Sequence, residues 1–267
     1  MAAAAVKGRL SALATALGTA LQAVLPGAAV SAVQEVDSTN AQLLNRARLG
    51  EASPCAMLAL HQTAGRGRLG RAWHGDPDAS LMVSLGVLLN PADWSGLSLA
   101  VGLAVAQALH ADVTLKWPND LWLGRGTSGR KLGGILIETV ANSGGSPGSA
   151  GRWCVVGLGL NIRPMVRGDL RTPSACLQEL LPGADLAQTA LAVVPAIASA
   201  LVQFERLGFA PLQAQFVQRD ALLNVSLVLS DGGVGVGAGV GDDGALLVHT
   251  EEGIRRVSSD EVRVRPS

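Results

Sequence analysis

The sequence HQTAGRGRLGRAWH, residues 61–74, directly follows the apolar run 56–60 and interleaves three arginines with three glycines. The apolar run predicts a strand, and the Gly/Arg-rich stretch predicts a loop. Glycine lets the backbone approach a ligand closely, and arginine presents a planar, permanently charged group that suits phosphate or carboxylate oxygens. We therefore expect a strand that leads into a basic loop, and we expect this loop to close over an anionic ligand.

Two other interpretations of this loop need to be weighed. Residues 65–70, GRGRLG, match the G-x-G-x-x-G fingerprint of dinucleotide-binding folds, which requires a following helix and an acidic residue about 20 positions later. Gly75 and Pro77 stand where that helix would begin, and residues 81–90 contain no acid. The sequence therefore disfavours the Rossmann interpretation. A solvated basic loop without a ligand remains an alternative.

Composition limits the class of protein. A chain of 267 residues accommodates one large domain, alone or with a smaller one. Lys plus Arg and Asp plus Glu number 21 each, so no net field would attract nucleic acid. Cys55, Cys154 and Cys176 lack paired metal-ligand spacing, and the four histidines are dispersed. We expect buried thiols in a reducing, cytoplasmic compartment and no transition-metal site.

Lysine is rare in this chain, which contains 18 arginines and three lysines. Lys7 lies near the N-terminus, whereas Lys116 and Lys131 lie in the interior of the sequence. Each interior lysine falls inside a distinctive motif. This usage indicates that arginine does not serve at these two positions.

The chain divides into three parts. Residues 1–30 are Ala/Leu-rich and predict a helical extension docked on the body rather than a signal peptide. Residues 31–220 form the expected main domain. From about residue 224 onward, short strands separated by Gly/Asp turns predict a small β-barrel at 221–267. The apolar stretches 97–110 and 186–204 predict buried helices rather than membrane spans, because the first is short and the second is interrupted by Pro195.

Local signals place the remaining elements. Ser38 or Thr39 predicts a helix start and Gly50 its end, and this cap alone would explain both hydroxyl residues. Glycines at 157 and 159 interrupt a strand, which indicates that a ligand or a helix packs closely on the backbone. Strands are expected at 80–89, 113–123 with a turn at 118–120, 130–140 and 153–162; loops at 124–129 and 141–151; and helices at 185–207 and 211–219.

Five motifs occur in order along the chain: DSTN at 37–40, GRGRLGR at 65–71, KWPND at 116–120, RKLGGILIE at 130–138 and GLGLNI at 157–162. In this order and spacing, the chain resembles the biotin protein ligases over most of residues 33–267. The resemblance implies an α+β fold, in which a mixed sheet related to class II aminoacyl-tRNA synthetases is flanked by helices and followed by an SH3-like barrel.

The resemblance also implies a two-step reaction. The carboxylate of biotin attacks the α-phosphate of ATP, which gives biotinyl-5′-adenylate and pyrophosphate. A lysine of a biotin carboxyl carrier domain then attacks the mixed anhydride and releases AMP. ATP with Mg²⁺ and biotin are the implied ligands, without a tightly bound cofactor. The implied partners are the carrier protein and a second copy of the chain in a homodimer.

Individual residues receive roles from the same resemblance. Lys131 is the expected essential cation, and Arg68 and Lys116 are expected to act with it in catalysis. The residues implied in biotin binding are Ser38, Thr39, Asn40, Gln62, Arg66, Gly67, Arg68, Lys131, Gly133 and Gly157. Those implied in ATP or adenylate binding are Arg66, Arg68, Arg71, Trp73, Lys116, Asn119, Lys131 and Asn161, with Asp120 holding Mg²⁺.

Alternatives remain at this stage. A lipoate or octanoate ligase or transferase of related fold would need a narrower, more apolar acid pocket, and a biotin sensor would bind without turnover. Trp73 is explained almost equally well as a core residue. About 30 Ala-rich residues precede the catalytic region, which leaves no room for a winged helix-turn-helix. We therefore expect a monofunctional enzyme that binds neither DNA nor a membrane.

Overall fold

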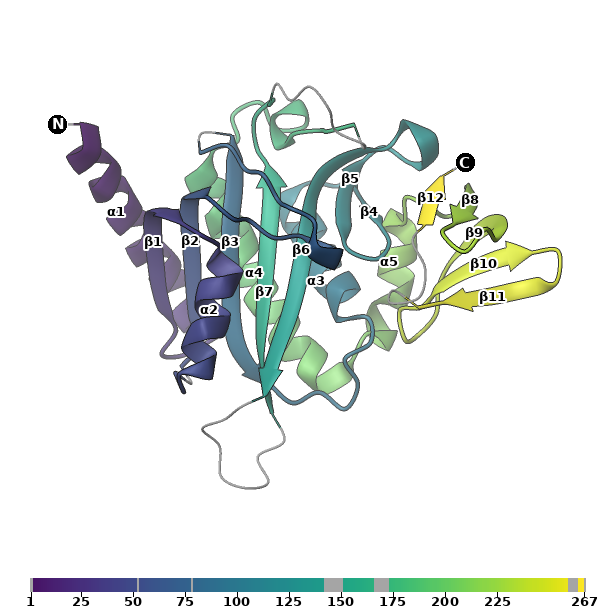
Figure 1. Ribbon diagram of the computed structural model, residues 1–267, viewed down its shortest axis with the longest axis horizontal. Helices are drawn as coiled ribbons and strands as arrows, with labels where there is room; N and C mark the ends of the chain where they lie inside the picture. Colours follow the sequence, from purple (N-terminus) through teal and green to yellow (C-terminus); the bar gives the residue numbers. More distant parts are fainter. Residues whose placement is uncertain are drawn as a thin grey trace.

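The computed structural model describes residues 2–51, 53–77, 79–141, 151–165, 173–258 and 264–266. A seven-stranded sheet with the order β1-β2-β3-β7-β6-β5-β4 forms the body (Figure 1). Its strands are β1 Ala29–Val36, β2 Cys55–Gln62, β3 Ser80–Leu89, β4 Val113–Lys116, β5 Asp120–Leu123, β6 Arg130–Ala141 and β7 Arg152–Asn161. β1 and β2 pair in parallel and the other neighbours pair antiparallel, so the sheet is mixed.

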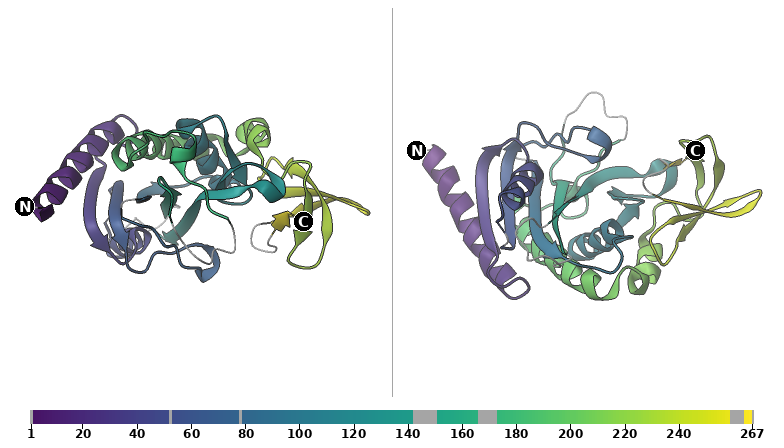
Figure 2. Two further views of the ribbon diagram at one scale, coloured as in Figure 1. Left: turned by 90° about the horizontal axis from the view of Figure 1, so that it is seen from above. Right: turned by 60° about the horizontal axis from the view of Figure 1, so that its bottom comes forward.

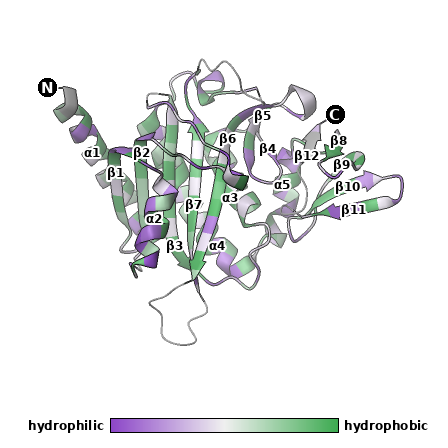
Figure 3. Ribbon diagram, viewed as in Figure 1, coloured by the Kyte–Doolittle hydropathy of each residue, from purple (hydrophilic) through white to green (hydrophobic). Residues whose placement is uncertain are grey.

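Helices cover both faces of this sheet (Figure 2). α3 (Leu97–Leu109) and α4 (Leu186–Leu207) pack against each other on one face, and α2 (Thr39–Arg48) packs on β3 and β7 from the other. Two apolar clusters result, a large one under α3 and α4 and a smaller one under α2. Because both faces are covered, β3 is apolar along most of its length, as its colouring in Figure 3 shows.

The N-terminal helix α1 (Ala2–Gln22) packs on β1 and α4, which confirms the predicted docked helix. Its buried residues Leu10, Leu13, Leu17 and Leu21 recur every three or four positions, so they form one apolar stripe. The strand after this helix was not predicted. β1 is an edge strand whose residues are half-buried or exposed, so its sequence AVSAVQEV lacks the apolar run that marks β2 and β3.

The predicted helix boundaries are confirmed. Ser38 caps α2, and Gly50 follows its end with φ +88°. The Asp185 carboxylate accepts a 2.8 Å hydrogen bond from the Gln188 amide at the start of α4. By length and composition alone α4 could cross a membrane, so Pro195 does not exclude a span as the sequence analysis assumed. Nine of its residues are nevertheless buried in the protein, as in the core helix of a folded domain.

A second, five-stranded sheet follows α5 (Gln213–Arg219), in the order β11-β10-β9-β8-β12. Its strands are β8 Ser226–Leu229, β9 Val234–Val240, β10 Leu246–Thr250, β11 Gly253–Val257 and β12 Val264–Pro266. The Trp117 indole joins the two sheets by donating a 3.0 Å hydrogen bond to the Gly244 carbonyl. The predicted C-terminal β structure is therefore present, while the boundary near residue 220 stays a prediction. Most of the predicted loop 141–151 lies outside the described residues.

Candidate active site

A cavity of about 590 Å³ opens where the end of β2, the basic loop, the β4–β5 turn and the middle of β6 and β7 meet. The basic loop, with its short turn η1 (Arg68–Gly70), lies over β6 (Figure 1). Fourteen residues with a predicted role line the cavity: Ser38, Thr39, Asn40, Gln62, Arg66, Gly67, Arg68, Arg71, Trp73, Lys116, Asn119, Asp120, Lys131 and Gly157. The structure therefore brings residues of all five motifs to one pocket.

One end of the cavity is built from neutral polar groups at the start of α2. The Thr39 amide donates to the Gln62 side-chain oxygen at 2.7 Å, and the Thr39 hydroxyl lies 2.7 Å from that of Ser84. Ser38 caps the helix by accepting from the Ala41 amide at 3.4 Å. The capping interpretation therefore holds for Ser38, while Thr39 is fixed by contacts with β2 and β3 instead.

Asn40 is the best-connected side chain at this neutral end. Its oxygen accepts a 2.5 Å hydrogen bond from Ser84, and its amide nitrogen donates to Glu138 at 3.0 Å and to the Leu136 carbonyl at 3.3 Å. Ser84 and Asn40 are both almost fully buried, where an unpaired polar group would be costly. The network therefore holds these groups rigidly at the cavity wall.

The glycines within β7 make room for two side chains. A β-carbon on Gly157 would lie 2.3 Å from the Asn40 oxygen, and one on Gly159 would lie 2.2 Å from the Trp73 ring. The sequence left open whether a ligand or a helix packs against these glycines. The close neighbours are a residue of α2 at Gly157 and a residue of the basic loop at Gly159. Gly133 on β6 is required for a different reason, because a β-carbon there would lie 2.6 Å from the backbone carbonyl oxygen of Gly159 on the neighbouring strand.

The other end of the cavity is strongly cationic. Arg66, Arg68, Arg71, Lys116 and Lys131 all line it, against Asp120 as the one carboxylate among the lining residues that the structure describes. The Lys131 ammonium lies 2.7 Å from an Asp120 oxygen and 5.9 Å from the centre of the Trp73 ring. This excess of positive charge is suited to a ligand with several anionic oxygens.

Lys116 is the second lysine that lines the cavity. Burial lowers the pKa of its ammonium group, while the nearby Asp120 carboxylate opposes this effect. Its ammonium stands 5.1 Å from the centre of the Trp122 ring, a cation–π contact. Lys116 and Asp120 face each other as a cross-strand pair on β4 and β5, on either side of the Pro118–Asn119 turn. The predicted turn between two strands is confirmed.

The basic loop is held at its base and open at its tip. The Trp73 amide donates to the Gly65 carbonyl at 2.9 Å, and the Gly67 amide donates to the Arg71 carbonyl at 2.7 Å. At the tip, Leu69 is 62% exposed and has φ +58°, an uncommon value for leucine. Among the described residues the guanidinium groups of Arg66 and Arg71 have no hydrogen-bond partner, so both are available to a ligand.

Two predicted residues do not line the cavity. Gly133 is buried behind it, and Gly134 takes the position on the cavity surface. Asn161 is 5% exposed and lies behind Lys131, where its amide nitrogen donates to the carbonyls of Ala175 at 3.1 Å and Lys131 at 3.4 Å. Its side-chain oxygen has no partner among the described residues.

Sequence reasoning missed several residues of the site. Ser84 and Glu138 hold Asn40, and Gly134, Val83, Leu136 and Ser230 line the cavity. Ser84 carries a usable signal, because it is a polar residue in the middle of an otherwise apolar strand. Ser230 follows β8 of the C-terminal sheet, so no local pattern could have placed it beside residues more than a hundred positions earlier.

The comparisons with known proteins agree with this geometry. A model of the Biotin/lipoate A/B protein ligase family matches residues 31–158. The chain is 35% identical over 253 residues to the bifunctional ligase/repressor BirA of Escherichia coli (strain K12), which covers 90% of this chain and 75% of that protein. It is 31% identical over 241 residues to the biotin–[acetyl-CoA-carboxylase] ligase of Paracoccus denitrificans, which covers 85% of this chain and 96% of that protein.

The fold leads to the same group. A biotin protein ligase from Aquifex aeolicus, solved in complex with biotin and ATP, superposes with a TM-score of 0.72 at 28% identity. The match covers 89% of this chain and 99% of that one. The motifs, the cavity and the relatives all point to one group, and the chain belongs to the biotin protein ligase family.

Proposed function

We propose that this protein activates biotin with ATP to biotinyl-5′-AMP and transfers the biotin to a lysine of a biotin carboxyl carrier domain. The observation that carries the proposal is the two-ended cavity. A rigid hydrogen-bonded network around Asn40 adjoins an end lined by five cations and one carboxylate. The uncharged polar ring of biotin matches the end around Asn40. The carboxylate of biotin and the phosphates of ATP match the cationic end.

The polar residues at the neutral end of the cavity fit a binding site for the ureido ring of biotin. Ser38, Thr39, Asn40 and Gln62 offer hydroxyl and amide groups there, and their partners within the protein hold them in place. A site built from buried, fixed hydrogen-bonding groups discriminates strongly against an acid that lacks the matching polar atoms. Lipoate and octanoate lack a ureido ring, so this end favours biotin.

The cationic end supports the first chemical step. The biotin carboxylate and the α-phosphate are both anions, so positive groups must offset their repulsion and the charge that develops as pyrophosphate leaves. We assign Lys131 to the oxygens shared by carboxylate and phosphate, with Arg66 and Arg68 around the adenylate and Lys116 on the phosphates. Lys131 exchanges its 2.7 Å contact with Asp120 for these substrate oxygens. We also propose that Arg71, Asn119 and Trp73 contact the nucleotide, whereas the buried Asn161 supports the backbone of Lys131 instead.

The residues present also fit a magnesium ion that enters with the nucleotide. Mg²⁺ is usually held by one or two carboxylates together with substrate phosphates, rather than by a cage of protein ligands. Asp120 supplies one carboxylate, and the structured parts of the chain contain no group of three or more His, Cys, Asp or Glu side chains. Bound in this way, Mg²⁺ would neutralise phosphate charge while Asp120 and the lysines orient the groups around it.

The second step needs no nucleophilic side chain, because the acceptor lysine itself attacks the anhydride. The protein must protect that anhydride from water. The basic loop, open at Leu69 and anchored at Trp73, is placed to close over the adenylate and exclude water. The implied partner is a biotin carboxyl carrier domain. Homodimerisation and a cytoplasmic location stay predictions.

The finer fold assignments follow from the same proposal. We infer that the seven-stranded sheet is of the type found in class II aminoacyl-tRNA synthetases, which also activate a carboxylate as an adenylate. The five short antiparallel strands at the C-terminus fit a small SH3-like barrel. Ser230 lines the cavity, which supports a contribution of this C-terminal part to ligand binding.

Transfer to an acceptor tests the proposed function. The purified protein is incubated with ATP, Mg²⁺, a biotin carboxyl carrier domain and either biotin, lipoate or octanoate, and the carrier is analysed by mass spectrometry. We expect modification of one carrier lysine with biotin alone. Modification by lipoate or octanoate instead would redirect the substrate assignment, and tight biotin binding without carrier modification would mean that the protein is a sensor.

A further inference from the structure

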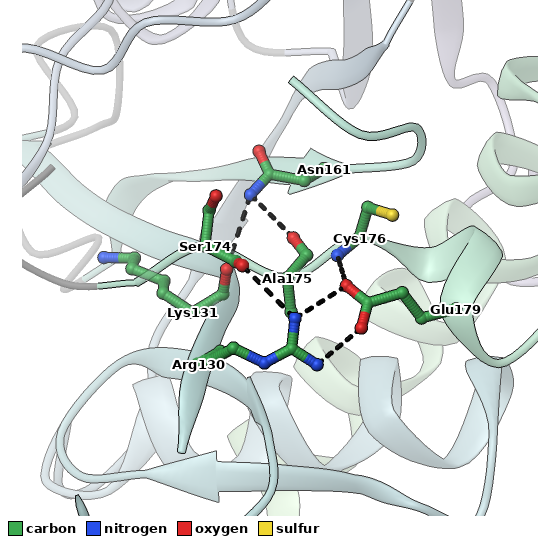
Figure 4. A network of polar contacts seen from close by, with 7 residues as sticks. All are labelled: Arg130, Lys131, Asn161, Ser174, Ala175, Cys176 and Glu179. Carbon is green, nitrogen blue, oxygen red and sulfur yellow. Dashed lines mark hydrogen bonds and ion pairs between the residues drawn. The ribbon is translucent and has the colours of Figure 1, made fainter. Parts of the chain in front are cut away.

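The backbone of Lys131 is paired with a segment that is distant in sequence. The Lys131 amide donates to the Pro173 carbonyl at 2.8 Å, and the Ala175 amide donates to the Lys131 carbonyl at 2.9 Å. Lys131 and Ser174 thereby form a parallel bridge outside the regular strands. Figure 4 shows this segment beside Lys131, whose ammonium points away from it.

This pairing compensates for an irregularity in the sheet. β6 pairs with β7 from Gly133 onward, and β7 ends at Asn161, so β7 has no partner for Lys131. On the other side, the register with β5 shifts next to Lys131, since Trp122 faces Lys131 and Leu121 faces Gly133. Such bulges redirect side chains. The segment 173–175 therefore supplies the contacts that define the backbone at Lys131.

An ion pair next to Lys131 holds this segment. The Arg130 guanidinium donates two hydrogen bonds to the Glu179 carboxylate, at 3.0 and 2.5 Å. The same carboxylate accepts from the Cys176 amide at 2.9 Å and so closes the turn η3 (Leu177–Glu179). Hydrogen bonding between the pair raises the pKa of Arg130 and lowers that of Glu179, so both groups carry full charge at neutral pH.

Arg130 and Lys131 are neighbours on a strand, so their side chains leave it in opposite directions. Lys131 enters the cavity and meets Asp120, whereas Arg130 meets Glu179 behind it (Figure 4). Asn161 also belongs to this group, since it donates to the carbonyls of both Lys131 and Ala175. One side of the strand therefore carries the Lys131 ammonium, which faces the cavity. The other side carries the Arg130–Glu179 ion pair, which holds the backbone of the strand in place.

We propose that the Arg130–Glu179 ion pair is a positioning device for Lys131. The ion pair holds segment 173–176 next to β6, and this segment provides the backbone hydrogen-bond partners of Lys131. These backbone contacts in turn fix the position of the Lys131 ammonium relative to Asp120 and the substrate oxygens. The catalytic part of this inference rests on the proposed function. Neither Arg130 nor Glu179 is among the residues that line the active-site cavity, so we infer that the pair acts on the reaction through Lys131.

The test uses variants that remove the charge of Arg130 or Glu179 but keep a side chain of similar size. Glu179→Gln removes the ion pair but leaves an oxygen for the Cys176 amide, Arg130→Met removes the cation, and Arg130→Lys retains it. We expect kcat of biotin-dependent adenylation to fall about tenfold in Glu179→Gln and Arg130→Met, equal to about 1.4 kcal/mol, with the KM for biotin nearly unchanged. Arg130→Lys should retain an intermediate kcat. The double variant should lose no more than either single one, because both changes remove the same interaction.

Glu51→Gln is the matched control, since Glu51 lies opposite Arg46 at the far end of α2 and its loss should leave kcat unchanged. Hydrogen exchange, read by mass spectrometry, provides a measurement that does not depend on turnover. In Glu179→Gln the amides of Lys131 and Ala175 should exchange faster than in the wild type. Absence of biotin-dependent turnover in the wild type would contradict the proposed function. Hydrogen exchange at Lys131 and Ala175 would still test whether the ion pair holds the backbone of Lys131. Unchanged exchange, or additive losses in the double variant, would overturn the inference.

Discussion

The indole of Trp73 lies directly on the backbone of Gly159. A β-carbon at position 159 would approach the ring to 2.2 Å, and the same indole is 5.9 Å from the Lys131 ammonium. The basic loop is thus anchored on the central sheet by one aromatic residue, next to the cation that we assign to catalysis. This contact explains why a tryptophan follows the Gly/Arg repeat and why β7 contains a glycine there.

Gly159→Ala should therefore displace Trp73 and loosen the basic loop. We expect weaker binding of the adenylate and a lower kcat for adenylation, because the loop arginines lose their fixed base. Titration calorimetry with biotin and ATP, together with steady-state kinetics, measures both effects. Gly183→Ala provides the control, since nothing lies within 4 Å of its added methyl group. Equal behaviour of the two variants would contradict the anchoring role.

Ser84→Ala should weaken both the fold and the biotin seat. The change leaves the buried Asn40 oxygen without its 2.5 Å donor. We expect a loss of about 1–3 kcal/mol in the free energy of unfolding, measured in urea, and weaker biotin binding. Ser98→Ala is the contrasting case, because the Ser98 hydroxyl is buried without a hydrogen-bond partner in the described structure. Its removal should leave stability unchanged or increase it.

Asp220 predicts a pH dependence of stability. Its side chain is fully buried, and desolvation raises its pKa from 3.8 to about 6 although the Leu222 amide donates to one oxygen. Ionisation is therefore harder in the folded state than in the unfolded one. The folded state binds the extra proton between about pH 4 and pH 6, so the contribution of Asp220 to stability falls as the pH rises through this window.

Asp220→Asn removes this titration. At pH 7 we expect the variant to be more stable than the wild type by up to about 3 kcal/mol, and we expect the two to converge near pH 4. Urea unfolding at a series of pH values measures the difference. A difference that is constant across this range would contradict the assignment to Asp220.

Leu17→Ala tests whether α1 belongs to the folded body. Leu17 is fully buried in the large apolar cluster, so truncation leaves a cavity. We expect a loss of about 2–5 kcal/mol in the free energy of unfolding. Leu49→Ala removes the same atoms from a side chain that is 76% exposed, and it should change stability by less than about 0.5 kcal/mol. Similar values for both would mean that α1 contributes little to the fold.

Local sequence patterns predicted much of the fold and the site. The strands β2, β3, β6 and β7, the cap at Ser38 and the cap at Asp185 follow from apolar runs and capping chemistry that neighbouring residues determine. The cavity residues followed from family motifs. The strand β1 was missed because an edge strand needs no apolar run, and its pairing with β2 is a tertiary contact.

The remaining differences concern contacts between distant segments. Asn161 was placed against the nucleotide, but its amide holds the carbonyls of Lys131 and Ala175, and residue 175 joins it only through folding. Glu138 lies within the motif that carries Lys131, yet its contact with Asn40 depends on how α2 packs across β6. A motif identifies a site, whereas its supporting contacts come from the fold.

The central claim is that this cavity forms biotinyl-5′-AMP with Lys131 as the essential cation. The most direct measurement is ATP–pyrophosphate exchange by the purified protein, with biotin, with lipoate and without any acid, in wild type and Lys131→Ala. We predict exchange that requires biotin and is lost in Lys131→Ala, while the variant remains folded by circular dichroism. Exchange at the wild-type rate in Lys131→Ala, or no exchange with any acid, would contradict it.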